Sequence, residues 1–123
     1  MNRLFRRAVS AFLTGAAVIA CLGAGPARAQ PAIVERAMPA PIIETAPPPP
    51  RAGVAWVPGH WVWRRGAWFW AKGHYVPGIV PAMPAAIVEV APPAPSPAHV
   101  WVRGHWAWEG GRWNWHRGIW FQP

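Results

Sequence analysis

Aromatic residues and glycines recur at fixed intervals in two stretches of this chain. Trp56, Trp63 and Trp70 are spaced by seven, a Gly lies three positions after each of them, and another aromatic residue lies two positions after each Gly. The stretch that begins at Trp101 has the same order, so the unit W-x-x-G-x-W-x, with Tyr75 once replacing Trp, occurs three times in each stretch. A Gly in every unit and the absence of Leu at heptad core positions argue against a coiled coil. Aromatic and β-branched residues interrupted by Gly predict strands and turns.

The centre of the second stretch has the layout of a tight β-hairpin. Its sequence W-A-W-E-G-G-R-W-N-W resembles the designed tryptophan zipper hairpins. A two-residue turn at Gly110-Gly111 allows positive φ at both positions. All four Trp then share one face, and opposite charges meet across the turn. The predicted pairs are Glu109 with Arg112, Trp108 with Trp113, Ala107 with Asn114 and Trp106 with Trp115, and in the first stretch Trp63 with Trp68 and Trp61 with Trp70.

The outer units of each stretch need a different connection. Suppose that every Gly, with the residue before it, formed a two-residue turn. The backbone groups at the two ends of the five-residue strand 60–64 would then have to point to neighbouring strands on opposite sides. Backbone N–H and C=O groups alternate in direction along a strand, so the two ends of a five-residue strand point to the same side and this arrangement is excluded. Two arrangements survive. One is a four-stranded meander with four-residue outer loops such as 57–60, and the other is one long hairpin in which Gly59 lies opposite Lys72.

These two arrangements differ in where the outer aromatic residues point. The meander keeps Trp56 and Tyr75 on the face of Trp61, whereas a straight hairpin places them on the other face, because an odd offset of five residues reverses side-chain direction. The straight hairpin also sets Pro58 opposite Gly73 at a hydrogen-bonded site, where Pro loses a ladder bond. The sequence therefore favours the meander.

An internal duplication organises the chain after its N-terminal segment. A shift of 45 residues aligns 37–76 with 82–121 and gives 20 identities in 40 positions. Each copy begins with a Pro-dense linker, a composition that favours extended polyproline II and opposes a packed core. The pieces Ile42-Ile43-Glu44 and Ile87-Val88-Glu89 recur within these linkers and resemble Ile33-Val34-Glu35. An interaction role for them is conceivable, although the simpler interpretation is a linker.

The N-terminus has the pattern of a secretory signal. Arg residues precede an apolar run from Ala8 to Leu22, and Ala27-Arg28-Ala29 supplies an A-x-A cleavage site. The run is too short for the ~20 apolar residues of a membrane-spanning helix. Val18-Ile19-Ala20-Cys21 also resembles a bacterial lipobox, in which case Cys21 is lipidated and the chain is an outer-membrane lipoprotein. We favour cleavage after Ala29, which leaves an exported chain without Cys.

The repeats Trp56-Val-Pro-Gly-His-Trp61 and Trp101-Val-Arg-Gly-His-Trp106 resemble the WXXGXW (YXWGXW) repeat family of small exported bacterial envelope proteins. The resemblance covers both repeat stretches and leaves out the linkers. It implies an exported envelope protein of unsettled biochemical role, and lipoproteins among its relatives. The chain departs from the usual Asn-Gly turn, since it has Arg65-Gly66 and Gly110-Gly111 at these places.

These patterns together predict an all-β fold, in which two small antiparallel Trp-rich β-meanders or hairpins follow a signal peptide and are joined by Pro-rich disordered or polyproline linkers. The expected boundaries are a signal peptide at 1–29, linkers at 30–53 and 77–98, and repeat modules at 54–76 and 99–123.

Composition restricts the chemistry of the chain. It contains no Asp, one Lys, two Ser, two Thr and four Glu, and no nucleophile–base pair is in view, so we predict no enzyme, catalytic residue or cofactor.

The net charge of +8 falls to +4 once residues 1–29 are removed. The remaining basic residues interleave with aromatic ones in a manner suited to single-stranded nucleic acid. Export argues against that reading, as does the position of most of these charges beside turns (Arg64, Arg65, Lys72, Arg103, Arg112, Arg117).

Histidines offer one candidate metal site. The predicted register sets His105 opposite His116 on the face away from the Trp, close enough for both rings to reach one ion. Ala71 takes the place of His116 in the first copy, and two His without Cys or Asp make a weak set of ligands. The remaining His60, His74 and His99 add no further ligand pair, and packing beside the turns is the simpler role for all five.

The function expected from the sequence is that of an exported, non-enzymatic structural or interaction module. In this interpretation the Trp form the core between two sheets. The alternative is a polysaccharide-binding protein, in which an exposed Trp face stacks on sugar rings. Partners are then an envelope protein or polysaccharide, the membrane only through a lipidated Cys21, or a second copy through the Trp faces. The candidate face residues are Trp56, Trp61, Trp63, Trp68, Trp70, Tyr75, Trp101, Trp106, Trp108, Trp113, Trp115 and Trp120.

Overall fold

The computed structural model describes residues 25, 29 and 31–123, so the predicted signal peptide lies almost wholly outside the described residues, as does Cys21. Residues 31–123 form one compact unit and contain strands but no helix. The all-β prediction is therefore confirmed for them. The strands are β1 (Val54–Val57), β2 (His60–Arg64), β3 (Ala67–Ala71), β4 (His74–Pro77), β5 (Val100–Val102), β6 (His105–Glu109), β7 (Arg112–His116) and β8 (Ile119–Phe121). Since the described part has no helix, it offers no helical span for a membrane.

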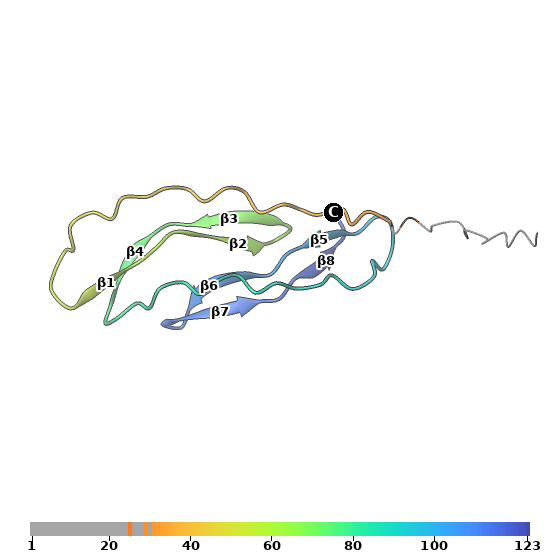
Figure 1. The fold of residues 1–123 in the computed structure, drawn as a ribbon. Coiled ribbons are helices and arrows are strands. Elements are labelled where there is room, and N and C mark those ends of the chain that lie inside the picture. The colour runs from red at the N-terminus through yellow and green to blue at the C-terminus, as the bar shows by residue number, and fades with distance from the viewer. Residues whose placement is uncertain (1–24, 26–28, 30) are drawn as a thin grey trace, which may run out of the picture. The chain divides into compact units, whose positions relative to one another are not determined.

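Each repeat is one long antiparallel hairpin (Figure 1). In the first, β1 pairs with β4 and β2 with β3. Val57 lies opposite His74 and His60 opposite Ala71, so a single register continues across the gap between the strands. Gly59 consequently faces Lys72. The second repeat is built alike from β5 with β8 and β6 with β7. The preference for a meander was wrong.

The side-chain directions nevertheless follow the expectation attached to the meander. Trp61 and Tyr75 both donate hydrogen bonds to the preceding linker, at Ala40 and Pro47, and Trp56 packs edge-on against Tyr75 with 5.0 Å between ring centroids. Trp56 and Trp61 therefore share a face, although five positions separate them. The cause is the break between β1 and β2, where the strand alternation loses one step. In the first repeat Pro58 lies at this break, where it has no N–H to donate.

The hairpin tips are tight turns. Arg65 and Gly66 have φ values of 50° and 78°, and Gly110 and Gly111 have 59° and 76°, the positive pair that a type I′ turn requires. All the strand pairs predicted around both tips are confirmed. The expected charge pair across the second tip takes a different form, because the carboxylate of Glu109 lies 3.3 Å from Nε2 of His116. His116 is four residues beyond Arg112 on the same strand.

The two hairpins pack against each other through β2 and β6. Along these strands the buried positions are His60 and Val62 in the first repeat, and His105 and Ala107 in the second. Because strand faces alternate, the Trp of β2 and β6 leave these strands on the other side. Small aliphatic and imidazole side chains therefore occupy the centre of the junction, and the expectation that Trp form the core between two sheets is wrong for that centre. Trp rings contact its margin, where Trp63 packs edge-on against Phe121, Trp68 against His105 and Trp113 against His60.

Both Pro-rich linkers lie along the hairpins that follow them. In Figure 1 the first linker runs beside the first hairpin from its tip to its open end, and then turns back into β1. The residues from 37 to 53 contain no helix or strand, and the same holds from 78 to 99. Each repeat is therefore a unit of linker plus hairpin, which gives a structural reason why the 45-residue duplication includes the linker.

Candidate functional site

The Trp of each hairpin form cross-strand pairs with edge-to-face geometry. The ring centroids of Trp61 and Trp70 are 5.2 Å apart, and those of Trp63 and Trp68 are 5.3 Å apart. Such pairs are preferred over face-to-face stacks because the positive ring edge meets the negative ring face. The second repeat has the equivalent pairs Trp101–Trp120, Trp106–Trp115 and Trp108–Trp113. Trp101 is buried and all other predicted face residues are half-buried, so the side chains predicted to share a face do so without lying open to solvent.

The first linker covers its Trp face through hydrogen bonds to aromatic donors. The indole Nε1 of Trp68 donates to the carbonyl of Arg36 at 3.2 Å, and that of Trp61 donates to the carbonyl of Ala40 at 3.0 Å. The hydroxyl of Tyr75 donates to the carbonyl of Pro47. Each contact satisfies a polar tip of an otherwise apolar ring.

The second linker repeats these contacts 45 residues later. Trp113 donates to Pro81 at 2.9 Å, Trp106 donates to Ala85 at 3.0 Å, and Trp120 donates to Pro92 at 3.1 Å. Every acceptor is a backbone carbonyl, so the acceptor residue can be Arg, Ala or Pro. The Trp face thus recognises the extended path of the linker backbone at three separate points.

A glutamate side chain anchors each linker to the hairpin that follows it. Glu44 accepts from Nε1 of Trp70 at 2.9 Å and from the backbone N–H of Gly73 at 2.7 Å. These two hydrogen bonds favour the charged carboxylate and, with help from Lys72, lower the pKa of Glu44 below its ordinary 4.5. We call this arrangement of one indole and one backbone N–H around a carboxylate the carboxylate clamp.

The second repeat has the same carboxylate clamp. Glu89 accepts from Trp115 at 3.1 Å and from the N–H of Gly118 at 2.7 Å. Partial burial raises the pKa of Glu89, but the two hydrogen bonds together with the charge of Arg117 lower it by more, so the net pKa lies below 4.5. The two linkers are therefore fixed by the same carboxylate chemistry.

The recurring glycines make room for Trp rings around the clamp. A Cβ on Gly73 would overlap the indole of Trp56, and a Cβ on Gly59 would overlap the indole of Trp70. In the second repeat, a Cβ on Gly118 would overlap the indole of Trp101, and a Cβ on Gly104 would overlap that of Trp115. The glycine in W-x-x-G-x-W thus permits close approach of a ring next to the clamp, while the glycines at the tips serve the turns.

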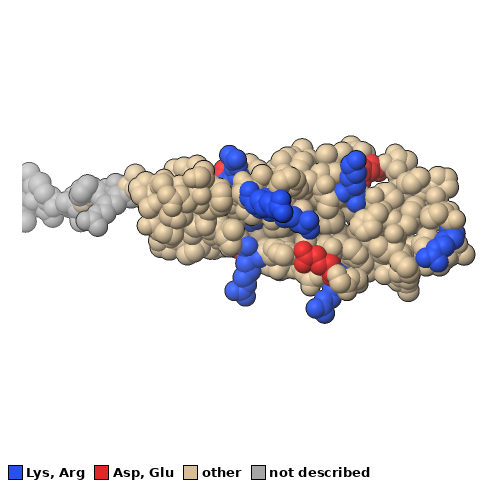
Figure 2. Space-filling view, turned by 180° about the vertical axis from the view of Figure 1, so that it is seen from behind, with Lys and Arg blue, Asp and Glu red and all other residues tan. Residues whose placement is uncertain are grey.

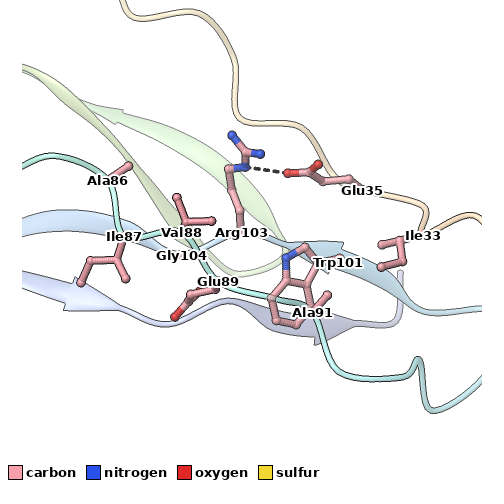
Figure 3. Close-up of a pocket in the computed structure, with 10 residues that line it drawn as sticks. All are labelled: Ile33, Glu35, Ala86, Ile87, Val88, Glu89, Ala91, Trp101, Arg103 and Gly104. Carbon is pink, nitrogen blue, oxygen red and sulfur yellow. Dashed lines mark hydrogen bonds and ion pairs between the residues drawn. The ribbon is translucent and has the colours of Figure 1, made fainter.

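A second kind of contact joins the start of the first linker to the second repeat. The N–H of Trp101 donates to Val34, and the N–H of Arg36 donates back to Trp101, both at 2.8 Å, which forms a parallel bridge at Glu35. Arg103 reaches across to Glu35 with 2.7 Å between Nε and Oε1 (Figure 3). Beside this bridge lies an open cavity of about 350 Å³, lined by apolar residues of both linkers, including Ile33 and Ile87.

Reciprocal histidine contacts connect the two repeats. Nε2 of His105 accepts the backbone N–H of Trp63 at 3.2 Å, and Nε2 of His60 accepts that of Trp108 at 3.3 Å. The predicted juxtaposition of His105 and His116 is confirmed, with rings stacked 5.1 Å apart. Within residues 25, 29 and 31–123 no group of three or more His, Cys, Asp or Glu side chains is placed to hold a metal ion. Since Nε2 of His105 already accepts a hydrogen bond, it is not available as a ligand.

Basic side chains are dispersed over the surface. On the face drawn in Figure 2 the Lys and Arg side chains do not merge into one continuous patch, and most of that face is uncharged. A cavity of about 300 Å³ between the repeats is lined mainly by equivalent pairs such as Met38 with Met83 and Trp61 with Trp106. Its one Lys or Arg side chain is Arg103, which is already paired with Glu35.

Sequence reasoning identified the Trp faces and missed what covers them. Glu44 and Glu89 were assigned to linkers without a structural role, yet they hold those linkers in place. A signal was present, because both glutamates occupy the same position of the 45-residue duplication. Ile33-Val34-Glu35 resembles the two pieces that contain these glutamates, but its contacts differ, since Glu35 pairs with Arg103 of the second repeat.

The motif pattern has a counterpart among known families. A family model described as the WXXGXW repeat matches the chain in two copies. The matched ranges are 51–74 and 62–78, which overlap in the first repeat, and 97–120 in the second. The matched ranges cover both hairpins almost completely and leave out the docked parts of the linkers. No curated protein and no solved structure matches the chain.

Proposed function

Because this chain is a WXXGXW repeat protein with two copies of the repeat, we propose that it is an exported, non-enzymatic protein of the cell envelope with a structural or interaction role. One observation carries the proposal. Each Trp face binds an extended Pro-rich segment, with aromatic donors spaced along the backbone and a carboxylate clamp. Aromatic-lined grooves that bind extended Pro-rich segments are a known mode of peptide recognition.

The repeats are suited to holding chain segments. Seven of the eleven Trp donate their indole N–H to a linker, and these hydrogen bonds use up the polar tips of the rings (Trp61, Trp68, Trp70, Trp106, Trp113, Trp115, Trp120). A module of this kind positions segments of its own chain or of a partner. The partner we propose is an envelope protein, and the proposal assigns no catalytic residue or cofactor.

Export is supported by the N-terminal sequence alone. The Arg residues, the apolar run and Ala27-Arg28-Ala29 have the order of a signal peptide, and cleavage after Ala29 yields a mature chain that begins at Gln30. The compartment we propose is the periplasm or the medium, with attachment to the outer membrane if Cys21 is lipidated instead.

Fractionation of a bacterial host that expresses the full chain with a C-terminal tag tests export. We expect a periplasmic product whose mass corresponds to a start at Gln30. The same result for Cys21→Ala would support cleavage after Ala29, and an uncleaved product from Ala29→Arg would confirm the site. A chain retained in the cytoplasm at full mass would refute the proposal. A mass increased by an acyl chain, and lost in Cys21→Ala, would identify a lipoprotein.

Trp fluorescence of the purified chain tests the interaction role against polysaccharide binding. Emission that does not change when peptidoglycan or lipopolysaccharide is added is expected, because the linkers already cover the Trp faces. A saturable shift would mean that sugars displace the linkers, and the polysaccharide alternative would then replace our proposal. Trp120→Phe removes one indole contact to a linker and serves to locate such a shift on the second face.

A further inference from the structure

The first 17 residues of the described continuous chain, residues 31–47, behave as one removable arm. The hydrogen bonds and the ion pair that join this arm to the rest of the described chain are made by residues 34–47, and the last of them is at the carbonyl of Pro47. The connection to β1 then consists of residues 48–53. The arm can therefore leave its hairpin as a unit if this connection opens.

The connection has the features of a hinge. Pro47 to Pro50 are four consecutive prolines, which favour an extended, semi-rigid chain. The reversal into β1 depends on Gly53, which has a φ of 75° and accepts a hydrogen bond from the N–H of Gly78 at 3.0 Å. A stiff segment next to a single tight reversal is the arrangement in which exchange of an element between chains costs little, because straightening one turn suffices.

The receiving face is defined by chemistry that the chain contains twice. Both hairpins bind a linker through backbone carbonyls at three places and one carboxylate in the clamp, and donors and acceptors occupy equivalent positions in the two repeats. The charges are complementary, because Glu44 lies near Lys72 and Glu35 pairs with Arg103. A second copy of this chain carries an arm with all of these features.

We propose that two copies of this protein exchange their arms, so that residues 31–47 of each chain cover the Trp face of the first hairpin in the other. A second copy of this chain is then the partner in the proposed interaction role, and this assignment rests on that role. Exchange preserves every contact of the arm and changes only the connection at 48–53. Cleavage after Ala29 would leave the arm with a free end, which makes the exchange topologically simple.

A mixing experiment with two complementary variants tests the exchange. Glu44→Gln weakens the arm and leaves the first Trp face intact, whereas Trp70→Phe removes a donor of that face and leaves the arm intact. In a mixture, the arm of the Trp70→Phe chain meets the intact face of the Glu44→Gln chain and restores the wild-type clamp. We expect native mass spectrometry to show heterodimers well above the statistical half of all dimers.

The control is wild type mixed with Ile79→Ala, an exposed position outside the arm, for which a statistical distribution is expected. Two outcomes would refute exchange. One is a statistical distribution for the complementary pair as well. The other is monomers alone at every concentration up to about millimolar, which is the range of effective concentrations for short flexible tethers.

A second variant makes the test independent of the clamp. Gly53→Ala places a side chain at positive φ in open space, so it strains the reversal of the closed monomer without a clash. Each dimer relieves two strained reversals, so we expect its dissociation constant to fall by at least about 30-fold by sedimentation equilibrium. Gly111→Ala has the same strain at the tip of the second hairpin and should leave this constant unchanged. An unchanged constant in Gly53→Ala would contradict the proposal. Both tests use purified protein, so their failure is distinguishable from a failure of export.

Discussion

The backbone N–H of Trp63 donates to Nε2 of His105, 3.2 Å away in the other repeat. In the reciprocal contact the N–H of Trp108, the equivalent of Trp63 in the second repeat, donates to His60, the equivalent of His105 in the first. Each imidazole therefore acts as an acceptor and must be neutral at that nitrogen. The two repeats are joined by this pair of hydrogen bonds, and a proton on Nε2 of His105 would remove the one from Trp63.

Acid should weaken this junction over a defined range of pH. Burial, reinforced by the neighbouring His116, lowers the pKa of His105 from 6.5 to about 4. The carbonyl of Arg103 and the carboxylate of Glu109 oppose this shift, and His60 adds to it. Between pH 6.5 and 4 the unfolded chain binds a proton at this site that the folded chain does not, so the free energy of unfolding falls as the pH is lowered. Below about pH 4 this site should contribute no further loss.

Urea unfolding followed by Trp fluorescence at pH 7.5, 6 and 4.5 measures the effect. His105→Gln should reduce the dependence of the free energy of unfolding on pH over this range. His74→Gln, at an exposed ring outside the junction, should leave that dependence as in wild type. If wild type and His105→Gln have the same pH dependence, the junction does not titrate as we argue.

A Cβ at Gly118 should be costly only because a Trp ring lies above it. Gly118→Ala would place its methyl group within the indole of Trp101, and overpacking of this kind typically costs about 1–3 kcal/mol. Gly118 is not one of the described glycines with positive φ, so backbone strain is not the cause of the cost. A double-mutant cycle with Trp101→Leu checks the mechanism, because the smaller side chain should remove most of the cost. An equal cost in both backgrounds would exclude the steric explanation.

The first hairpin tip offers a stabilising substitution. Arg65 is the one residue other than Gly with positive φ in the described chain, at 50°. Asn tolerates this left-handed region better than Arg, and Asn-Gly is a preferred type I′ turn. Arg65→Asn should therefore raise the free energy of unfolding by about 0.5–1 kcal/mol, measured by urea titration. The same substitution at Arg64, which lies in β2, should give no gain. A loss of stability in Arg65→Asn would count against this account of the turn.

Local sequence patterns determined the hairpins well. The period of seven, the Gly at each tip and the alternation of Trp fixed the strand pairs from Trp61 to Trp70 and from Trp106 to Trp115, since these depend on neighbours within ten residues. The outer strands were harder to predict. Pro58 argued against a straight hairpin, and the structure accommodates it by interrupting the ladder while the register continues.

Long-range contacts explain what the sequence did not reveal. The burial of His60 and His105 at the junction depends on how two hairpins pack, and no local pattern specifies that. The docked linkers are a different case. Pro density correctly indicated an extended chain, but extension alone does not show whether a segment is free or bound. The position of Glu44 opposite Trp70 and Gly73 decides this, and it becomes apparent only in three dimensions.

The carboxylate clamps should control how well the linkers cover the Trp faces. Both glutamates have a pKa below 4.5, so their contribution to stability is complete above that pH and is lost as the pH falls through the folded-state pKa. Glu44→Gln combined with Glu89→Gln turns an amide N–H toward donors and should release both linkers at neutral pH.

Acrylamide quenching of Trp fluorescence and the emission maximum report this release. The double variant should show stronger quenching and a red shift at pH 7, which wild type should approach only below pH 4.5. Glu109→Gln is the matched control, because its carboxylate contacts His116 on the exposed surface and no linker. Its quenching should equal that of wild type. Neither glutamate lies in a hairpin strand, so far-UV circular dichroism should change little. If the double variant had wild-type quenching, the carbonyl contacts alone would retain the linkers.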